Sequence, residues 1–231
     1  MLNIRLNEDH GHANHGWLDT HFTFSFANYY DPEHIGFRAL RVINEDFIAP
    51  GMGFGAHPHK DMEILSYVLN GELGHRDSLG SGGVIRHGDV QFMSAGTGIR
   101  HSEANPSSTE TTHMLQIWLL PNQNELDPKY EQKTFPIDTQ PNRLHLIASR
   151  DGRDGSFLIR SDAEVYAGKL DGGTTVDQTL TRNHGWVQVA VGEVTVNGKT
   201  LQAGDGLAID GEGWVQVIAT DKAEILLFDL G

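Results

Sequence analysis

Hydrophobic and polar positions alternate along this chain in many short segments. Apolar residues occupy every second position in runs such as ILSYVLNGEL (64–73), GDVQFMSAG (88–96), HMLQIWLL (113–120) and WVQVAVGEVTVNG (186–198). A period of two is typical of β-strands, and no long segment has the 3.6-residue period of a helix. Many short strands at a spacing of roughly ten residues predict an all-β fold built as an antiparallel sandwich or barrel.

The pattern of the first half returns in the second half. VLNGE (68–72) matches VAVGE (189–193) with an offset of 121 residues, and HGDVQFM (87–93) matches AGDGLAI (203–209) with an offset of 116. Nearly constant offsets indicate a duplicated β-unit with a short deletion in the second copy. The alternative is that two β-rich halves share the same turn residues by chance.

A boundary between the two copies is expected near the middle of the chain. The segment 119–138 contains three prolines and little periodicity, which is typical of a surface connector. We therefore predict an N-terminal domain over residues 1–133 and a C-terminal domain over residues 134–231.

Composition narrows the classes of function. The chain of 231 residues has no cysteine, which excludes disulfides and thiolate metal sites. Its formal net charge of -14 argues against direct nucleic acid binding and against an anionic membrane partner. No uninterrupted apolar segment approaches ~18 residues, and the first residues lack a secretory pattern, so a cytoplasmic protein is expected. A monomer is predicted, because two β-units can cover their own sheet edges.

Four side chains of the ligand type fall into two i, i+2 pairs. His57 and His59 flank Pro58, and His101 precedes Glu103 in GTGIRHSEANP. Residues i and i+2 of a strand point to the same side, so each pair can face one interior point. Pro58 cannot donate a ladder hydrogen bond, which predicts an edge strand or a bulge. Three imidazoles and a carboxylate suit a mononuclear iron, manganese, copper, nickel or zinc site, whereas a single HxH pair is often incidental.

The second copy lacks all four side chains. With the offset of 121, the two histidines map to Gln178 and Leu180. With the offset of 116, the other pair maps to Val217 and Ala219. The candidate ligands are thus a property of the first copy, and the β-fold does not need them.

Two segments resemble the pirin family of the cupin superfamily: HPHKDMEILSYVLNGELGHRDS and GDVQFMSAGTGIRHSE. The N-terminal GHANHGWLDTHFTFSFANYYDP resembles bacterial pirin-like proteins. The resemblance implies two cupin-type antiparallel β-barrels of jelly-roll type, with His57, His59, His101 and Glu103 as metal ligands and without Glu63. The chain departs from the general cupin pattern at Ser94, where proline is common, and the glycine-rich pirin form fits better.

The resemblance also implies an activity. Pirin-family members have quercetin 2,3-dioxygenase activity, which opens the flavonol ring with dioxygen and releases carbon monoxide. The expected cofactor is one divalent transition metal ion, iron first, with zinc, manganese, copper, nickel or cobalt as alternatives. The expected substrates are a flavonol or similar phenol and dioxygen, with Glu103 as the catalytic base. Phe54 and Phe92 match pocket positions of the family, although ordinary core packing explains them equally well.

Other readings stay open. The protein can instead be a metal-binding, redox-sensing or transcription-regulatory protein with a protein partner, or a cupin with another activity such as an isomerase. Glu63 is either a hydrogen-bond acceptor behind a ligand histidine or a surface carboxylate. The N-terminal histidines His10, His12, His15 and His21 invite a second metal site, but solvated or packed side chains are the expectation.

Overall fold

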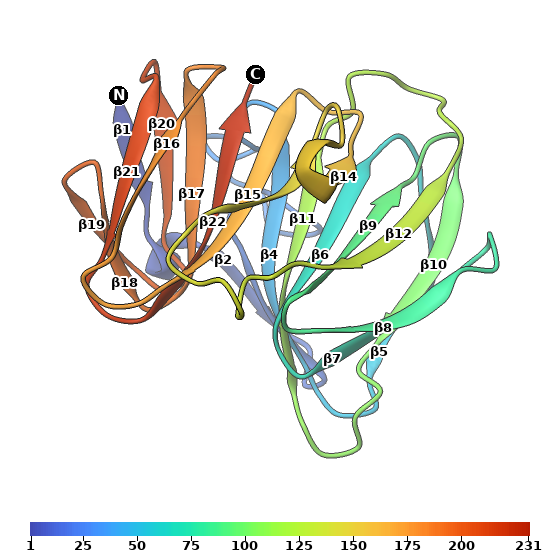
Figure 1. Ribbon diagram of the computed structural model, residues 1–231. Coiled ribbons are helices and arrows are strands. Elements are labelled where there is room, and N and C mark those ends of the chain that lie inside the picture. The colour runs from blue at the N-terminus through green and yellow to red at the C-terminus, as the bar shows by residue number, and fades with distance from the viewer. The chain divides into compact units, whose positions relative to one another are not determined.

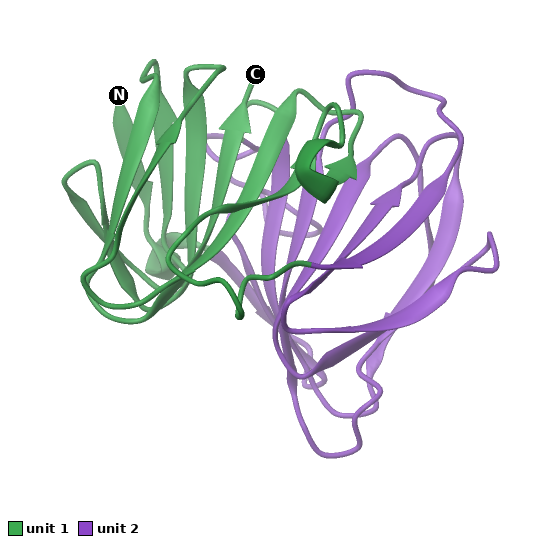
Figure 2. Cartoon of the chain, viewed as in Figure 1, with its two compact units in different colours: residues 1–10, 37–39, 135–231 green, residues 11–36, 40–134 purple.

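The chain folds almost entirely into β-strands. A computed structural model describes residues 1–231 and contains 22 strands and two short 3₁₀-helices, Asn7–Asp9 (η1) and Arg153–Gly155 (η2) (Figure 1). This confirms the all-β prediction. None of its helices has the length and apolar character needed to cross a membrane. Two compact units divide the chain, and Figure 2 shows them in different colours.

The unit that contains the candidate ligands comprises residues 11–36 and 40–134. It has one seven-stranded sheet, ordered β12-β9-β6-β11-β4-β3-β2, and one four-stranded sheet, ordered β5-β10-β7-β8. Pairing within both sheets is antiparallel, as the sequence predicts. Its strands are β2 (Gly11–Asn14), β3 (Leu18–Phe22), β4 (Leu40–Ile48), β5 (Gly53–His59), β6 (Glu63–Asn70), β7 (Glu72–Asp77), β8 (Gly82–Arg86), β9 (Asp89–Ser94), β10 (Ile99–Ala104), β11 (Thr112–Leu119) and β12 (Lys129–Thr134).

The other unit comprises residues 1–10, 37–39 and 135–231. Its seven-stranded sheet is ordered β1-β20-β17-β22-β15-β13-β14 and its four-stranded sheet β16-β21-β18-β19. Its strands are β1 (Leu2–Arg5), β13 (His145–Ser149), β14 (Phe157–Leu158), β15 (Ala163–Leu170), β16 (Thr175–Thr179), β17 (His184–Val191), β18 (Glu193–Val196), β19 (Lys199–Gln202), β20 (Gly206–Asp210), β21 (Trp214–Ala219) and β22 (Ala223–Leu230).

The strand orders of the two units correspond. Each four-stranded sheet places the strands in the same relative order, with β5, β10, β7 and β8 matched by β16, β21, β18 and β19. In the larger sheets, β9-β6-β11-β4 is matched by β20-β17-β22-β15. This shared topology supports the duplication inferred from the glycine-acid pairs.

The units do not follow the chain continuously. The division at residues 134 and 135 lies one residue from the predicted boundary, but Met1–His10 and Phe37–Ala39 group with the C-terminal residues. The reason is sheet pairing: β1 lies antiparallel to β20, with Leu2 opposite Ile209. Alternation along the sequence identifies strands but does not identify their partners.

The predicted connector 119–138 is partly wrong. Residues 129–134 form β12, an edge strand paired with β9. The segment KYEQKT has lysines and a glutamate at positions that are exposed or half-buried, and such charged residues are common on edge strands. Weak apolar periodicity therefore concealed a strand rather than indicating a loop.

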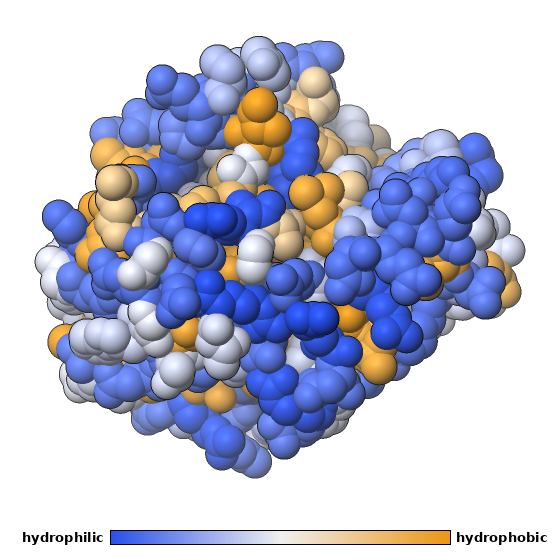
Figure 3. All heavy atoms as spheres, turned by 90° about the horizontal axis from the view of Figure 1, so that it is seen from above, coloured by the Kyte–Doolittle hydropathy of each residue, from blue (hydrophilic) through white to orange (hydrophobic).

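The interiors of the two units differ in chemistry. The C-terminal unit is filled by aliphatic side chains such as Val194, Val215, Val217 and Leu227. Strands of the small sheets alternate between buried and exposed residues, as expected of a sheet with one solvated face. On the molecular face shown in Figure 3, hydrophilic atoms predominate and apolar residues form separated spots.

Candidate metal centre and substrate cavity

Three of the predicted ligands meet at one point between β5 and β10. The strand β5 is the edge of its sheet, which confirms the prediction from Pro58. His57 lies directly opposite His101 in the register of the two strands. The ring centroids of His57, His59 and His101 are 4.4–4.8 Å apart, and their ligand nitrogens lie within 4.8 Å of one another.

The free nitrogens of this cluster suit a metal ion. Nδ1 of His57 donates to the carbonyl oxygen of Gly55 at 2.8 Å, which leaves its Nε2 as a lone-pair donor. Nε2 of His59 and Nε2 of His101 are buried and have no hydrogen-bond partner in the protein. Burial lowers the pKa of His59 to about 4, and burial also lowers the pKa of His101 to about 3. Both rings are therefore neutral near pH 7, as metal ligands must be.

Glu103 lies beside the histidines within a network of donors. Its carboxylate forms a second ligand group with His101 and His75, again within 4.8 Å. Nε2 of Gln91 donates to its Oε1 at 2.8 Å, and Nε2 of Gln116 donates to its Oε2 at 3.0 Å. The hydroxyl of Ser66, which has a single proton, lies 3.1 Å from the same carboxylate. These contacts fix the orientation of the Glu103 side chain.

The side chains that contact Glu103 come from one row across the large sheet. Ser66 of β6 lies opposite Gln91 of β9 and opposite Gln116 of β11. Gln116 in turn lies opposite Asn44 of β4. Ser66, Gln91 and Gln116 each interrupt an apolar stretch of their strand, and this is the sequence signal that could have identified them.

A buried pair supports His101 from behind. Nδ1 of His101 lies 3.4 Å from Nδ1 of His75, and Nε2 of His75 lies 3.0 Å from Oδ2 of Asp77. With Nε2 of His101 kept for a metal, its Nδ1–H donates to His75, whose Nε2–H donates to Asp77. Sequence reasoning missed this arrangement, although His75 and Asp77 are themselves an i, i+2 pair on β7.

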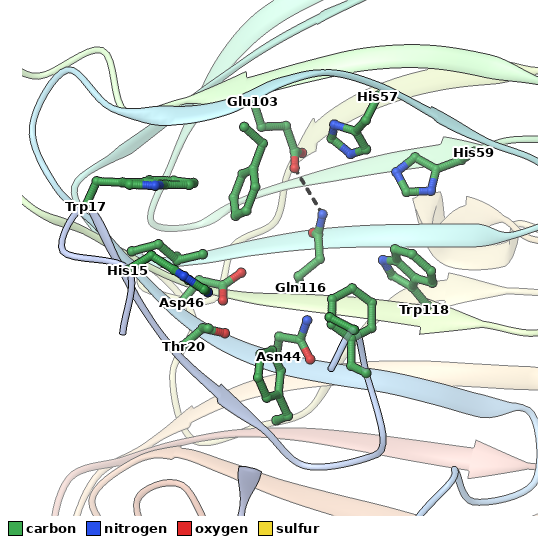
Figure 4. Close-up of a pocket in the computed structure, with 15 residues that line it drawn as sticks. His15, Trp17, Thr20, Asn44, Asp46, His57, His59, Glu103, Gln116 and Trp118 are labelled. Carbon is green, nitrogen blue, oxygen red and sulfur yellow. Dashed lines mark hydrogen bonds between the residues drawn. The ribbon is translucent and has the colours of Figure 1, made fainter. Parts of the chain in front are cut away.

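A cavity of about 510 Å³ opens beside the cluster (Figure 4). It is walled mainly by aromatic side chains, and His57, His59 and Glu103 line it too. Phe54 lines the cavity although it is three residues from His57, an odd spacing that regular alternation places on opposite faces. A β-bulge explains this, since three steps on β5 match two on β10. The aromatic residues that line the cavity are Trp17, Phe22, Phe26, Phe54 and Trp118.

For two other residues the sequence leaves alternatives open, and the structure selects between them. Phe92 does not line this cavity and is fully buried elsewhere. The side chain of its neighbour Gln91 points to Glu103, so the side chain of Phe92 points to the opposite face of β9. Glu63 is also buried and accepts a hydrogen bond from Ser94, which excludes the surface alternative.

The pairing register revises the equivalence between the two copies. Val217 of β21 lies opposite Val176 of β16, as His101 lies opposite His57. If Val217 stands for His101, the equivalent of His57 is Val176 rather than Gln178. The offset of 121 residues is therefore two residues out of register for this strand, a difference that preserves the inward face but shifts the pairing.

The N-terminal histidines separate into different environments. His12, Asp19 and His21 form a partly exposed group, in which Nε2 of His12 lies 2.6 Å from Oδ1 of Asp19. His12 and His21 are cross-strand neighbours with stacked rings. His15 instead lines the cavity. The four predicted side chains therefore do not form one cluster.

Comparison with known proteins identifies the family to which the chain belongs. The Pirin family model matches residues 3–119, and the model described as the quercetinase C-terminal cupin domain matches residues 146–230. Together with the two corresponding units, these matches define a two-domain cupin protein. The chain belongs to the pirin family, which confirms the resemblance seen in its sequence.

Relatives cover the whole chain. A protein of Escherichia coli K12 named quercetin 2,3-dioxygenase is 51% identical over 231 residues, with 100% of this chain and 99% of that protein covered. The crystal structure of YhhW from Escherichia coli has a TM-score of 0.96 and 49% identity, covering 100% of this chain and 98% of the other. The bacterial pirin YhhW in complex with nickel(II) has a TM-score of 0.94 and 49% identity, covering 100% and 99%.

Proposed function

We propose that this protein is a metal-dependent dioxygenase of the quercetin 2,3-dioxygenase type. The observation that carries the proposal is a cluster of three imidazoles, two of which line an aromatic cavity of about 510 Å³. This volume lies within the range of roughly 300–1,000 Å³ that is typical of pockets for small-molecule ligands. The names of two Escherichia coli relatives support the same activity.

The residues that would hold the metal are His57, His59, His101 and Glu103. Their nitrogen and oxygen donors suit several divalent transition metals, so nickel, which the relative binds, and iron are both candidates. When bound, such an ion supplies Lewis acidity that lowers the pKa of a flavonol hydroxyl and assists the reaction with dioxygen. Nε2 of His59 and Nε2 of His101, which are buried without a hydrogen-bond partner, fit the role of metal ligands.

The chain itself would position the substrate and move its proton. The carboxylate of Glu103 would take the proton of the flavonol 3-hydroxyl, while Gln91 and Gln116 hold the carboxylate in place. Trp17 and Phe54, which contact each other edge to face, would pack against the flat rings and exclude water. The resulting flavonolate reacts with dioxygen, the ring opens and carbon monoxide leaves.

The test compares purified protein variants loaded with iron(II) or nickel(II). The wild type is expected to bleach quercetin in the presence of dioxygen and to release carbon monoxide in step. His57→Ala should lower kcat/KM by at least about 100-fold, because a lost ligand disrupts both the cofactor and substrate geometry. His184→Ala, which removes a partly exposed imidazole from the other unit, is the matched control and should keep full activity.

Full turnover by His57→Ala, with metal content unchanged, would exclude this assignment. A wild-type protein that binds metal at the cluster but has no turnover with either ion would instead favour a regulatory pirin. Metal content is measured on the same preparations by elemental analysis.

A further inference from the structure

The cavity wall opposite the histidines carries three buried polar side chains, Thr20, Asn44 and Asp46, which we call the polar wall. Each is at most 4% exposed and each lines the cavity. Thr20 of β3 lies opposite Asp46 of β4, and Asn44 shares the face of Asp46 two residues away. Figure 4 shows the polar wall on one side of the cavity, with His57, His59 and Glu103 on the other and Gln116 between them.

A buried acceptor of the polar wall has no partner within the protein. Oδ1 of Asn44 makes no hydrogen bond. Its cross-strand neighbour Gln116 uses its Nε2 on Glu103 and its Oε1 on Ser66, so it is not available to Asn44. An unpaired buried amide oxygen is unfavourable, and an apolar residue at this position would avoid that cost. A ligand in the cavity that carries a hydrogen-bond donor can pair with this oxygen.

Asp46 adds a second polar group without a counter-charge. Burial raises the pKa of Asp46 to about 7, against the lowering effect of the Thr20 hydroxyl. No lysine or arginine lines the cavity. A buried carboxyl group without a nearby lysine or arginine can form a hydrogen bond with a neutral hydroxyl, whereas it disfavours an anion beside it.

A buried donor without a partner lies nearer the histidine cluster. Nε1 of Trp118 is buried without a partner, and the Trp118 ring meets the ring of His59 edge to face at 5.0 Å. The cavity thus offers a donor near the histidines and an acceptor at the far wall. A flavonol carries the complementary groups. Its carbonyl, beside the 3-hydroxyl, is an acceptor, and the phenolic hydroxyls on its outer rings are donors.

We propose that the polar wall binds a phenolic hydroxyl on the part of the substrate farthest from the histidine cluster. The protein would thereby select polyhydroxylated flavonols over a flavonol that carries only the 3-hydroxyl. This inference rests on the proposed function in one respect, namely that a flavonol enters this cavity. It adds Asn44 and Asp46 as residues that determine specificity.

Binding can be measured without turnover. Nickel(II)-loaded protein is titrated under anaerobic conditions with quercetin and with 3-hydroxyflavone, and quenching of Trp17 and Trp118, which line the cavity, reports occupancy. The variants are Asp46→Asn and Asn44→Leu, each close in size to the original residue. Glu45→Gln is the matched control, because Glu45 points to the other face of β4 and binds His113 at 2.7 Å.

The expected result is a selective loss. Each variant should weaken quercetin binding by about tenfold, the equivalent of one hydrogen bond of about 1.4 kcal/mol, and change 3-hydroxyflavone binding by less than about twofold. Glu45→Gln should match the wild type with both ligands. Circular dichroism and thermal melting show whether each variant is folded, and either folded variant suffices for the comparison.

The outcomes separate this inference from the proposed function. Equal losses for both ligands, or no loss for quercetin, would overturn the role of the polar wall while leaving the dioxygenase proposal intact. Selective loss in a protein without turnover would overturn the dioxygenase and keep the polar wall. Absence of quenching by either ligand in the wild type would overturn both.

Discussion

His101 is a base that the folded protein keeps from binding a proton. Its pKa falls from 6.5 to about 3, first because of burial and then because of His57 and His75. Between these values the unfolded chain binds a proton that the folded chain does not, so the free energy of unfolding decreases as pH falls below about 6.5. Above pH 6.5 both states are neutral and the effect disappears.

This predicts a pH-dependent difference between the metal-free wild type and His101→Asn. From pH 7 to pH 5, the wild type should lose more stability than the variant, by less than about 1.4 kcal/mol per pH unit, the limit for one proton. Urea unfolding of both proteins at each pH measures it. Asp46, whose raised pKa gives the opposite sign between pH 3.8 and about 7, contributes equally to both proteins. Identical pH slopes would contradict the prediction.

At the scale of the element, the site depends on how closely β5 approaches β10. A Cβ atom on Gly53 would lie 2.2 Å from the carbonyl oxygen of Glu103 and 2.4 Å from Cα of Ala104. Both are backbone atoms that cannot move aside without displacing β10. On the same strand, a Cβ atom on Gly55 would meet nothing within 4 Å.

Gly53→Ala should therefore separate the histidine pair of β5 from His101 and Glu103. We expect nickel(II) affinity to fall by about 10–100-fold, the range seen when the support of metal ligands is lost. Gly55→Ala, the matched control, should change affinity by less than about twofold, since the new methyl group enters open space. Isothermal titration calorimetry compares the two, and equal affinities would show that the strand spacing is not critical.

Period-two alternation predicted which side chains share a face, but it could not predict irregular pairing. It placed His57 with His59 and His101 with Glu103 because both pairs are two residues apart. Alternation could not explain why Phe54 points into the cavity, since the bulge that turns this residue inward can be recognised only when the partner strand is known. Gly55, a glycine within the strand, and Pro58 were local signs of that bulge. For Phe92, alternation counted from Gln91 gives the right answer once the role of Gln91 is known.

At the scale of the whole molecule, comparison of the two copies shows that the fold and the histidine cluster depend on different residues. The two units share their strand order, yet one interior holds the histidine cluster and the other is packed with aliphatic residues. The all-β class and the repeat could be predicted from the sequence because strand periodicity is local. The assignment of Met1–His10 to the C-terminal unit could not, because it depends on pairing between residues about 200 positions apart.

A substitution in the second copy is therefore expected to change stability but not metal binding. The test position is Val217, which corresponds to His101. Val217→Ala removes a buried side chain that is 1% exposed and should lower the free energy of unfolding by about 1–3 kcal/mol. Nickel(II) stoichiometry should remain at the wild-type value, because no candidate ligand is changed. Denaturant unfolding and elemental analysis measure the two quantities, and loss of metal from folded Val217→Ala would show that the copies are not independent.

The pairing of β1 with β20 has a consequence for synthesis on the ribosome. The strand Leu2–Arg5 emerges before its partner Gly206–Asp210, which is translated about 200 residues later. At about 5–20 residues per second, the first strand waits roughly 10–40 s without its neighbour. Residues 11–134 are complete long before then, so the unit with the histidine cluster can fold while the first strand is still unpaired. An early strand of the nascent chain is thus among the last elements to reach its native position.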